Sequence, residues 1–204
     1  MNNENLVEDD KVREFYVWVD EENFLVKHNI KFTKSLTVIP VQEGEDLITF
    51  VPNPNRKAGF LSPFQYNLIV DYWTEYNLEL TKRAYFKNYP SRLEALFLLD
   101  TFDDAKMYKK THERHVAGRT LKKVRSNGRY KFSKHDVGWI DFLHEDVMFD
   151  DKTIHDVSNE YWNGNTVKDV SFTLRGESCT FDSIYELLYI GRVDILDSLE
   201  TVTI

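Results

Sequence analysis

Short alternating segments dominate the first quarter of the chain. Glu14–Val19 alternates apolar and polar side chains and is rich in aromatic and β-branched residues, which predicts a first strand. Asp20–Asn23 follows as an acidic turn. From Phe24 to Val51 the pattern predicts further short strands around polar turns, at residues 36–39 and 47–51. The region is therefore expected to be a loop-rich part of a sheet.

Helical spacing of apolar residues begins after this region. Ser62 and Pro63 suit the cap and first turn of a helix expected over residues 63–86. Thr101–Asp104 is a second capping pattern, and it precedes a helix expected to reach Val116. These two segments predict helices on either side of residues 89–99.

Strand patterns return in the second half of the chain. Residues 120–124 and 129–132 are expected to form a hairpin around Asn127-Gly128, because Asn-Gly favours two-residue turns. A helical unit is expected to begin near residues 135–143, and a helix over 151–162 should end at Asn163-Gly164. The last strands are expected at residues 170–174, 184–190 and 193–196, with a turn at Gly191-Arg192.

Residues 89–99 combine polar groups with an apolar run. Tyr89-Pro90-Ser91-Arg92 places a hydroxyl beside a guanidinium, and Leu93–Leu99 is expected to be a buried strand. Polar groups at the start of a core strand are typical of a ligand site, but they are equally typical of ordinary capped backbone. Both interpretations stay open at this point.

Composition limits the class of protein. With 204 residues and 42% hydrophobic content, we expect one domain over residues 12–204, after a disordered or frayed segment at 1–11. No window approaches about 20 consecutive apolar residues, and the first ten residues are polar and acidic. We therefore expect neither a membrane span nor a signal peptide, and a cytoplasmic location. One cysteine cannot form an internal disulfide.

Charge is distributed unevenly along the chain. Residues 106–134 hold eleven Lys or Arg and one acid, a net charge of +10, so the remainder carries −18 of the overall −8. Such a basic surface could bind the phosphates of RNA, DNA or a dinucleotide, or an acidic partner protein. It could also be a solvated segment without a partner.

Several common catalytic motifs are absent from the sequence. Neither phosphate-binding glycine loop, G-x-x-x-x-G-K-[ST] or G-x-G-x-x-G, occurs, and neither do G-x-S-x-G or H-E-x-x-H. His112 and His115 are three residues apart but lack further ligands at metal-binding spacing, so no metal site is expected. Kinase, P-loop, Rossmann and common hydrolase functions lose their main support.

Four motifs follow one another in a fixed order: Tyr89-Pro90-Ser91-Arg92 with its apolar run, His135-Asp136, Glu160–Gly164, and Tyr185-Glu186 before Gly191. In this order and spacing, over about residues 12–197, the chain resembles an uncharacterised bacterial and phage branch of the ADP-ribosyltransferase superfamily. The resemblance implies an α+β fold in which a split, mostly antiparallel sheet, flanked by helices, clasps NAD+.

The resemblance also implies roles for individual residues. Glu186 would be the catalytic carboxylate, binding a ribose hydroxyl of NAD+ and stabilising positive charge as the nicotinamide bond breaks. Ser91 takes the middle position, and Arg92 could bind the pyrophosphate or, alternatively, pair with a structural carboxylate. The superfamily usually has His or Arg on the first strand, where this chain offers Tyr16, Val17 and Trp18 and, earlier, Arg13. Of these, Tyr16 and Arg13 are the candidates for binding NAD+.

We expect, on this resemblance, a transferase that attaches ADP-ribose to nucleic acid or protein, of the toxin or anti-phage kind. Its basic 106–134 region would approach an RNA or DNA acceptor, and its acidic remainder would suit a neutralising protein partner. The alternative is a non-enzymatic nucleic-acid- or protein-binding regulator with a degenerate transferase fold. That regulator would hold nucleic acid through Lys122, Lys123, Arg125 and Arg129.

Overall fold

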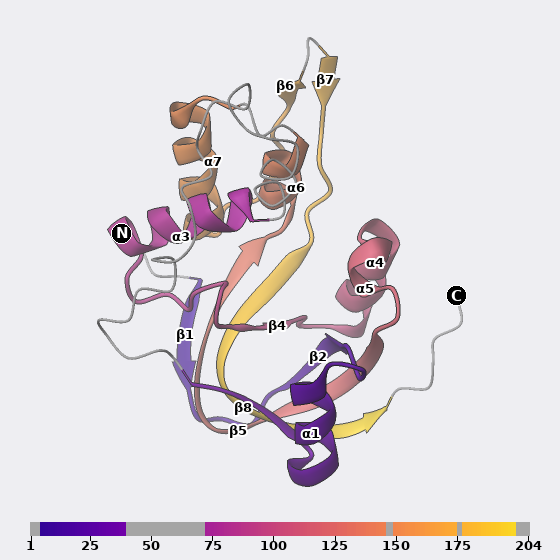
Figure 1. Cartoon of the computed structure of the whole chain (residues 1–204). Helices are drawn as coiled ribbons and strands as arrows, with labels where there is room; N and C mark the ends of the chain where they lie inside the picture. Colours follow the sequence, from indigo (N-terminus) through magenta and orange to yellow (C-terminus); the bar gives the residue numbers. More distant parts are fainter. Residues whose placement is uncertain (1–4, 40–71, 146–148, 175–176, 199–204) are drawn as a thin grey trace. The chain divides into compact units, whose positions relative to one another are not determined.

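The computed structural model describes residues 5–39, 72–145, 149–174 and 177–198 (Figure 1). The chain divides into two compact units. The first takes its described residues from Met1–Pro40, Glu94–Lys134 and Ile184–Ile204, and the second from Val41–Leu93 and His135–Ser183. Each unit joins segments that are distant in sequence.

The first unit is built on two long strands, β5 (Thr120–Asp136) and β8 (Tyr185–Ser198), which are hydrogen-bonded neighbours (Figure 1). Two short strands pair antiparallel with β5 and two with β8. Those on β5 are β1 (Leu6–Asp9) and β2 (Glu14–Val19), and those on β8 are β3 (Ser35–Val38) and β4 (Leu96–Leu98).

The sheet closes on itself at one point. Tyr16 in β2 and Leu99, directly after β4, exchange backbone hydrogen bonds of 2.9 and 2.8 Å. Hydrogen bonding therefore runs from β2 to β5, β8 and β4 and back to β2. A closed ring of strands leaves fewer unpaired edges than an open sheet.

Aromatic side chains from these strands form the main core. Phe15 is fully buried, and its ring contacts the rings of Tyr189 and Phe132 edge-on, at centroid distances of 5.7 and 5.9 Å. Val17 and Val19 alternate with it along β2 and join the same cluster. The predicted first strand is thus confirmed, with its apolar positions facing the core.

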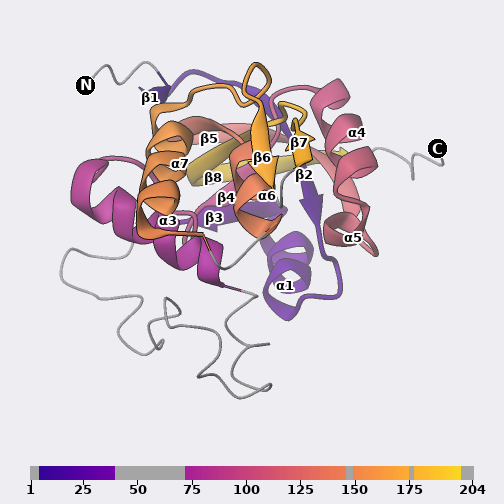
Figure 2. The same ribbon diagram turned by 90° about the horizontal axis from the view of Figure 1, so that it is seen from above.

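The other face of β2 is covered by α4 (Phe102–Thr111), which α5 (Glu113–Val116) follows (Figure 2). Trp18 donates its indole N–H to the Ala105 carbonyl, 3.3 Å away. The capping box predicted at Thr101 is present, because the Thr101 hydroxyl and Asp104 carboxylate bond each other's backbone amides. The predicted helix from there to Val116 occurs as these two shorter helices.

Residues 24–33, expected to be strand and turn, form the helix α1 (Phe24–Thr33). The Asn23 side chain accepts hydrogen bonds from the amides of Leu25 and Val26 and so starts this helix. Asparagine favours turns and helix caps for the same reason, so the sequence signal was ambiguous. The strand predicted at 36–39 occurs one residue earlier, whereas the one at 47–51 lies outside the described residues.

Two predicted turns were wrong, because both of their glycines lie inside long strands. Gly128 belongs to β5 and Gly191 to β8, with backbone φ angles of +80° and +141°. A Cβ built on Gly191 would lie 3.0 Å from the Cβ of Tyr130, which is two residues after Gly128. The positive-φ position of β8 therefore lies close to that of β5. Asn-Gly supplies a positive φ, and a distorted strand uses that conformation as well as a hairpin does.

Two further expectations about strands need correction. Residues 6–9, placed in the frayed segment, form β1, and Val7 pairs with Phe132 of β5. The partner strand decides this, because its Lys131 pairs with the acidic Glu8, and the sequence of the terminus alone does not reveal it. Of the predicted Leu93–Leu99 strand, only Leu96–Leu98 pairs with β8.

The second unit contains helices α3 (Trp73–Tyr85), α6 (Gly138–Glu145) and α7 (Asp151–Asn163), with α3 and α7 side by side (Figures 1 and 2). Two short strands, β6 (Phe172–Leu174) and β7 (Glu177–Cys179), pair antiparallel. α7 ends at Gly164, in the left-handed conformation expected from the sequence. α3 confirms the second half of the helix predicted over 63–86, and its predicted start lies outside the described residues.

The fold class predicted from the sequence is confirmed at the level of an α+β protein with a mostly antiparallel sheet and flanking helices. Among the helices that the structure describes, none has the length and apolar character needed to cross a membrane.

Candidate functional site

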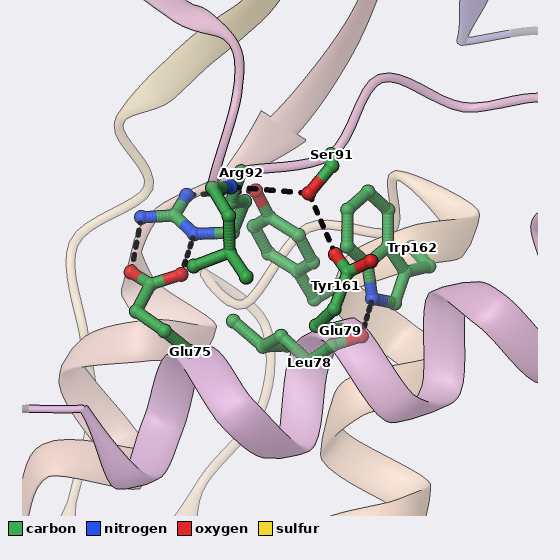
Figure 3. Close-up of polar contacts among 8 residues, drawn as sticks. Glu75, Leu78, Glu79, Ser91, Arg92, Tyr161 and Trp162 are labelled. Carbon is green, nitrogen blue, oxygen red and sulfur yellow. Dashed lines mark hydrogen bonds and ion pairs between the residues drawn. The ribbon is translucent and has the colours of Figure 1, made fainter. Parts of the chain in front are cut away.

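Ser91 lies in a buried polar network in the second unit, shown in Figure 3. Its side-chain hydroxyl donates a 2.7 Å hydrogen bond to Oε2 of Glu79 on α3, and it accepts one from the Leu93 amide. Glu79 is itself buried, and its Oε1 receives a 2.9 Å bond from Arg83. The Ser91 hydroxyl thus ties the segment before β4 to α3.

Arg92 forms a bidentate ion pair with Glu75, one turn before Glu79 on α3. Its Nε and Nη2 atoms lie 2.7 and 2.9 Å from the two carboxylate oxygens. Figure 3 draws both contacts as dashed lines. Nη1 donates a third bond, of 2.9 Å, to the Tyr161 hydroxyl on α7. A planar guanidinium matches a carboxylate in this way, so Arg92 joins α3 to α7 through a fixed geometry.

The charge state of Glu75 follows from this pair. Burial alone would raise the pKa of Glu75, but the Arg92 charge and its hydrogen bonds outweigh burial and hold the pKa below its usual value. Arg92 is 9% exposed and Glu75 27% exposed, so water screens the pair only partly. The alternative considered for Arg92, an ion pair with a structural carboxylate, is observed.

His135 lies fully buried among aromatic rings of the same unit. Its ring stacks on Tyr161 at 4.5 Å and meets Trp162 edge-on at 5.0 Å. Nδ1 lies 2.8 Å from the Tyr161 carbonyl oxygen, which can only accept, so this nitrogen carries the proton. Burial lowers the pKa of His135 to about 3, which makes the imidazole neutral at physiological pH.

Asp136 is a fully buried carboxylate with backbone partners. Its oxygens accept hydrogen bonds from the amides of Gly138 and Val167, at 3.0 and 2.9 Å. Thr166 adds a weaker hydroxyl contact at 3.3 Å. The His135-Asp136 motif thus fixes local backbone: Asp136 holds the start of α6 and the segment after α7.

Glu186 belongs to the first unit and lies near the start of β8. It is 3% exposed, between Tyr185 and the core residue Leu187. Because side chains alternate along a strand, Glu186 and the buried Leu188 face away from the core that Leu187 and Tyr189 join. The structure therefore places a buried carboxylate on the face of β8 opposite this core.

The two candidates on the first strand have partners within the first unit. Arg13 forms a 2.8 Å ion pair with Asp100, and its guanidinium lies 5.1 Å from the Phe132 ring centroid. The ring of Tyr16 packs against that of Phe102 under α4, at 5.7 Å. Of the four candidates for cofactor binding, Ser91 and Arg92 thus lie together in one unit, and Arg13 and Tyr16 belong to the other unit. Their binding of NAD+ stays a prediction.

The four candidates for nucleic-acid binding all form ion pairs along β5. Lys122 pairs with Glu21, Lys123 and Arg125 share Glu14, and Arg129 pairs with Glu8. Lys131 and Lys106 have carboxylate partners too, so at least six of the eleven cations between residues 106 and 134 are paired. Carboxylates of β1 and β2 thus reduce the positive field that the sequence suggested.

The histidines of α4 and α5 form a stack of rings. His112 lies on Tyr108 with a centroid distance of 4.5 Å, and His115 lies 5.7 Å further on. Within the ranges that the structure describes, no cluster of three or more His, Cys, Asp or Glu side chains could hold a metal ion.

Sequence reasoning missed the partners of Ser91 and Arg92. Glu75 and Glu79 were not singled out, although they lie one turn apart on the predicted helix and could have marked a shared face. Tyr161 was noted as part of the Glu160–Gly164 motif, but not as a partner of Arg92. Chemically, their arrangement is a clamp: it satisfies the hydroxyl and the guanidinium internally and fixes residues 89–92 to α3 and α7.

The chain matches the model of a protein family. The family model described as "Protein of unknown function (DUF2441)" matches residues 8–196. No curated protein matches the chain.

Proposed function

The chain belongs to the DUF2441 family, and from its own residues we propose that it is an NAD+-dependent ADP-ribosyltransferase acting on a macromolecule. The proposal rests on the resemblance of its ordered motifs to that superfamily. The observation that carries it is the burial of Glu186, 3% exposed on a central strand, at the position that the resemblance assigns to the catalytic carboxylate.

The proposed reaction is a substitution at C1′ of the nicotinamide ribose. The bond from C1′ to the nicotinamide nitrogen breaks, and its electron pair leaves with neutral nicotinamide. A nucleophile of the acceptor forms the new bond to C1′ and releases its proton to water. Glu186 would hold a ribose hydroxyl and stabilise the positive charge that develops on the sugar, as carboxylates do in glycoside cleavage.

Transfer of label from NAD+ tests the proposal. The protein would be incubated with labelled NAD+ and either cell lysate, purified RNA or single-stranded DNA. Label should reach the acceptor, and Glu186→Gln should lower the rate by at least about 100-fold, within the range typical of lost transition-state charge stabilisation. Glu177→Gln, at an exposed position, is the matched control.

Two results would contradict the proposal: no transfer by the wild type to any of these acceptors, or equal rates for wild type and Glu186→Gln. Thermal unfolding with NAD+ supplies a second readout. A ligand at 100 times its dissociation constant should add about 2.7 kcal/mol to the free energy of unfolding.

The internal partners of Ser91 and Arg92 favour a second candidate function. We infer, as the alternative, a non-enzymatic regulator that keeps the fold and binds nucleic acid or protein. It predicts binding without turnover and no role for Glu186. Toxin activity and a neutralising partner protein remain predictions under either candidate.

A further inference from the structure

Helix α1 has an unusually exposed apolar surface. Its described residues include no buried side chain, and Phe24, Leu25 and Phe32 are 76%, 68% and 66% exposed. Single exposed apolar residues are normal, but three on one short helix form a patch. The charge and geometry around the patch indicate which kind of partner fits it.

Three rings form a row along α1. Phe24, His28 and Phe32 follow one another at spacings of four residues and therefore lie on one face. Their ring centroids are 6.3 Å apart for Phe24 and His28 and 4.7 Å apart for His28 and Phe32. The ring row thus presents three exposed aromatic groups in line.

Lysines border the ring row on one side. Lys27 and Lys31 are four residues apart and adjoin it on the helix surface, and the Lys31 ammonium lies 5.3 Å from the Phe32 centroid. Lys34 follows at the end of the helix, and residues 24–34 contain no acid. Beyond the lysines is a cavity of about 400 Å³, lined by Lys27, Lys31, Lys122, Ile30, Glu21 and Glu22.

Two of these lysines already have carboxylate partners. Glu22 lies 3.5 Å from Lys27, in an exposed pair, and Glu21 pairs with Lys122. An exposed pair such as that of Lys27 with Glu22 contributes little to stability. Among the described residues, no ion pair to a carboxylate occurs for Lys31 or Lys34, so the lysine border keeps a net positive charge.

We propose that α1 is a binding surface for single-stranded nucleic acid. Unpaired bases would stack on the ring row, and the backbone phosphates would lie along Lys27 and Lys31 at the cavity edge. Aromatic platforms beside a positive groove are the usual means of binding single strands without sequence preference. A lipid surface fits less well, because the polar imidazole of His28 is in the middle of the row.

The binding is independent of NAD+ cleavage. Measured without NAD+, it can fail while ADP-ribosyl transfer succeeds, or succeed while transfer fails, so the two proposals are tested separately.

Fluorescence anisotropy with a labelled oligothymidylate or oligouridylate of about 12 nucleotides provides the test. The wild-type protein should bind at low salt and prefer the single strand to a duplex of the same length, whose base faces are covered. The double variant Phe24→Ala/Phe32→Ala should raise the dissociation constant at least about tenfold. Phe97→Ala, which removes a 41% exposed ring from β4, is the matched control and should leave it unchanged.

The lysines supply a second readout. Lys27→Gln/Lys31→Gln should reduce the slope of log K against log salt by about 1.4, because each single-strand phosphate contact contributes about 0.7. The proposal is overturned if the wild type binds neither oligonucleotide, or if Phe97→Ala weakens binding as much as the ring variant. If Phe24→Ala/Phe32→Ala loses binding to phosphatidylserine vesicles but binds the oligonucleotide as the wild type does, the proposal is wrong and the surface binds membranes. If that variant loses only self-association, the proposal is wrong and the surface binds a second copy of the chain.

Discussion

Arg92 joins three elements through one guanidinium, and its removal would leave the Glu75 carboxylate without this partner in a largely buried place. We predict that Arg92→Met lowers the free energy of unfolding by about 3 kcal/mol, as expected when one member of a buried pair is removed. Urea unfolding at pH 7 measures the change. The free energy of unfolding of Arg92→Lys should lie between those of the wild type and Arg92→Met, because an ammonium keeps the charge but cannot make the bidentate contact.

The matched control for this prediction is Lys152→Gln. Lys152 is 85% exposed and pairs with Asp156 one turn along α7. This substitution should not shift the unfolding curve measurably. Equal effects of Arg92→Met and Lys152→Gln would show that the Arg92 pair is not a structural clamp.

His135 should make stability depend on pH. The unfolded chain binds a proton at this residue below about pH 6.5, whereas burial lowers the pKa of the folded His135 to about 3. Between these values the unfolded state holds more protons. The free energy of unfolding should therefore fall on acidification, by up to about 1.4 kcal/mol per pH unit from this residue.

His135→Phe isolates this effect. The variant should be less stable than the wild type at pH 7, since the hydrogen bond to Tyr161 is lost. The difference in unfolding free energy between the two proteins should shrink as the pH is lowered from 7 to 4, because only the wild type contains the buried imidazole that destabilises the fold on acidification. The effects of the carboxylates common to both proteins cancel in this difference. A constant difference over this range, or the same change in His155→Phe at an exposed position, would rule out the buried imidazole as the cause.

At the scale of elements, the two long strands depend on glycine where each is irregular. Gly128→Ala should lower the unfolding free energy by about 1–2 kcal/mol, because φ is +80° there although space for a Cβ is open. Gly191→Ala should have a larger effect, since its Cβ would also lie 3.2 Å from the Tyr189 ring.

Urea unfolding of both glycine variants, with Gly128→Asn as a third, measures this difference. Asparagine tolerates positive φ, so Gly128→Asn should be milder than Gly128→Ala. If Gly191→Ala were as stable as the wild type, the close approach of β8 to β5 at Tyr130 would be contradicted.

At the scale of the whole molecule, the sequence suggests one basic surface and the structure suggests another. The charges on β5 are paired with the carboxylates of Glu8 and Glu14, whereas Lys31 on α1 lies against an exposed ring. We predict that Lys123→Gln/Arg125→Gln/Arg129→Gln changes affinity for a single-stranded oligonucleotide by less than about threefold. Lys27→Gln/Lys31→Gln should weaken it more.

Anisotropy titrations at one fixed salt concentration compare these variants, because affinities at different salt are not comparable. A stronger loss for the triple variant than for the α1 variant would return the nucleic-acid surface to β5, where the sequence alone placed it.

Local signals predicted several elements well. Alternation along Glu14–Val19, the capping box at Thr101 and the glycine stop at Gly164 each depend on neighbouring residues alone, and each is present. The signals at Asn23, Gly128 and Gly191 failed for one reason. Each favours a particular backbone conformation that a helix cap, a distorted strand or a turn can use equally well.

The sequence by itself determined the α+β class, the strands and helices with strong periodicity, and which residues are chemically notable. Tertiary structure alone decided their partners: Glu75 for Arg92, Glu79 for Ser91, and the carboxylates of β1 and β2 for the lysines of β5. The physical reason is range. Periodicity and capping act over a few residues, whereas the side-chain hydrogen bonds and ion pairs of this fold join residues 12 to more than 100 positions apart. These long-range contacts determine whether a charge is available to a ligand.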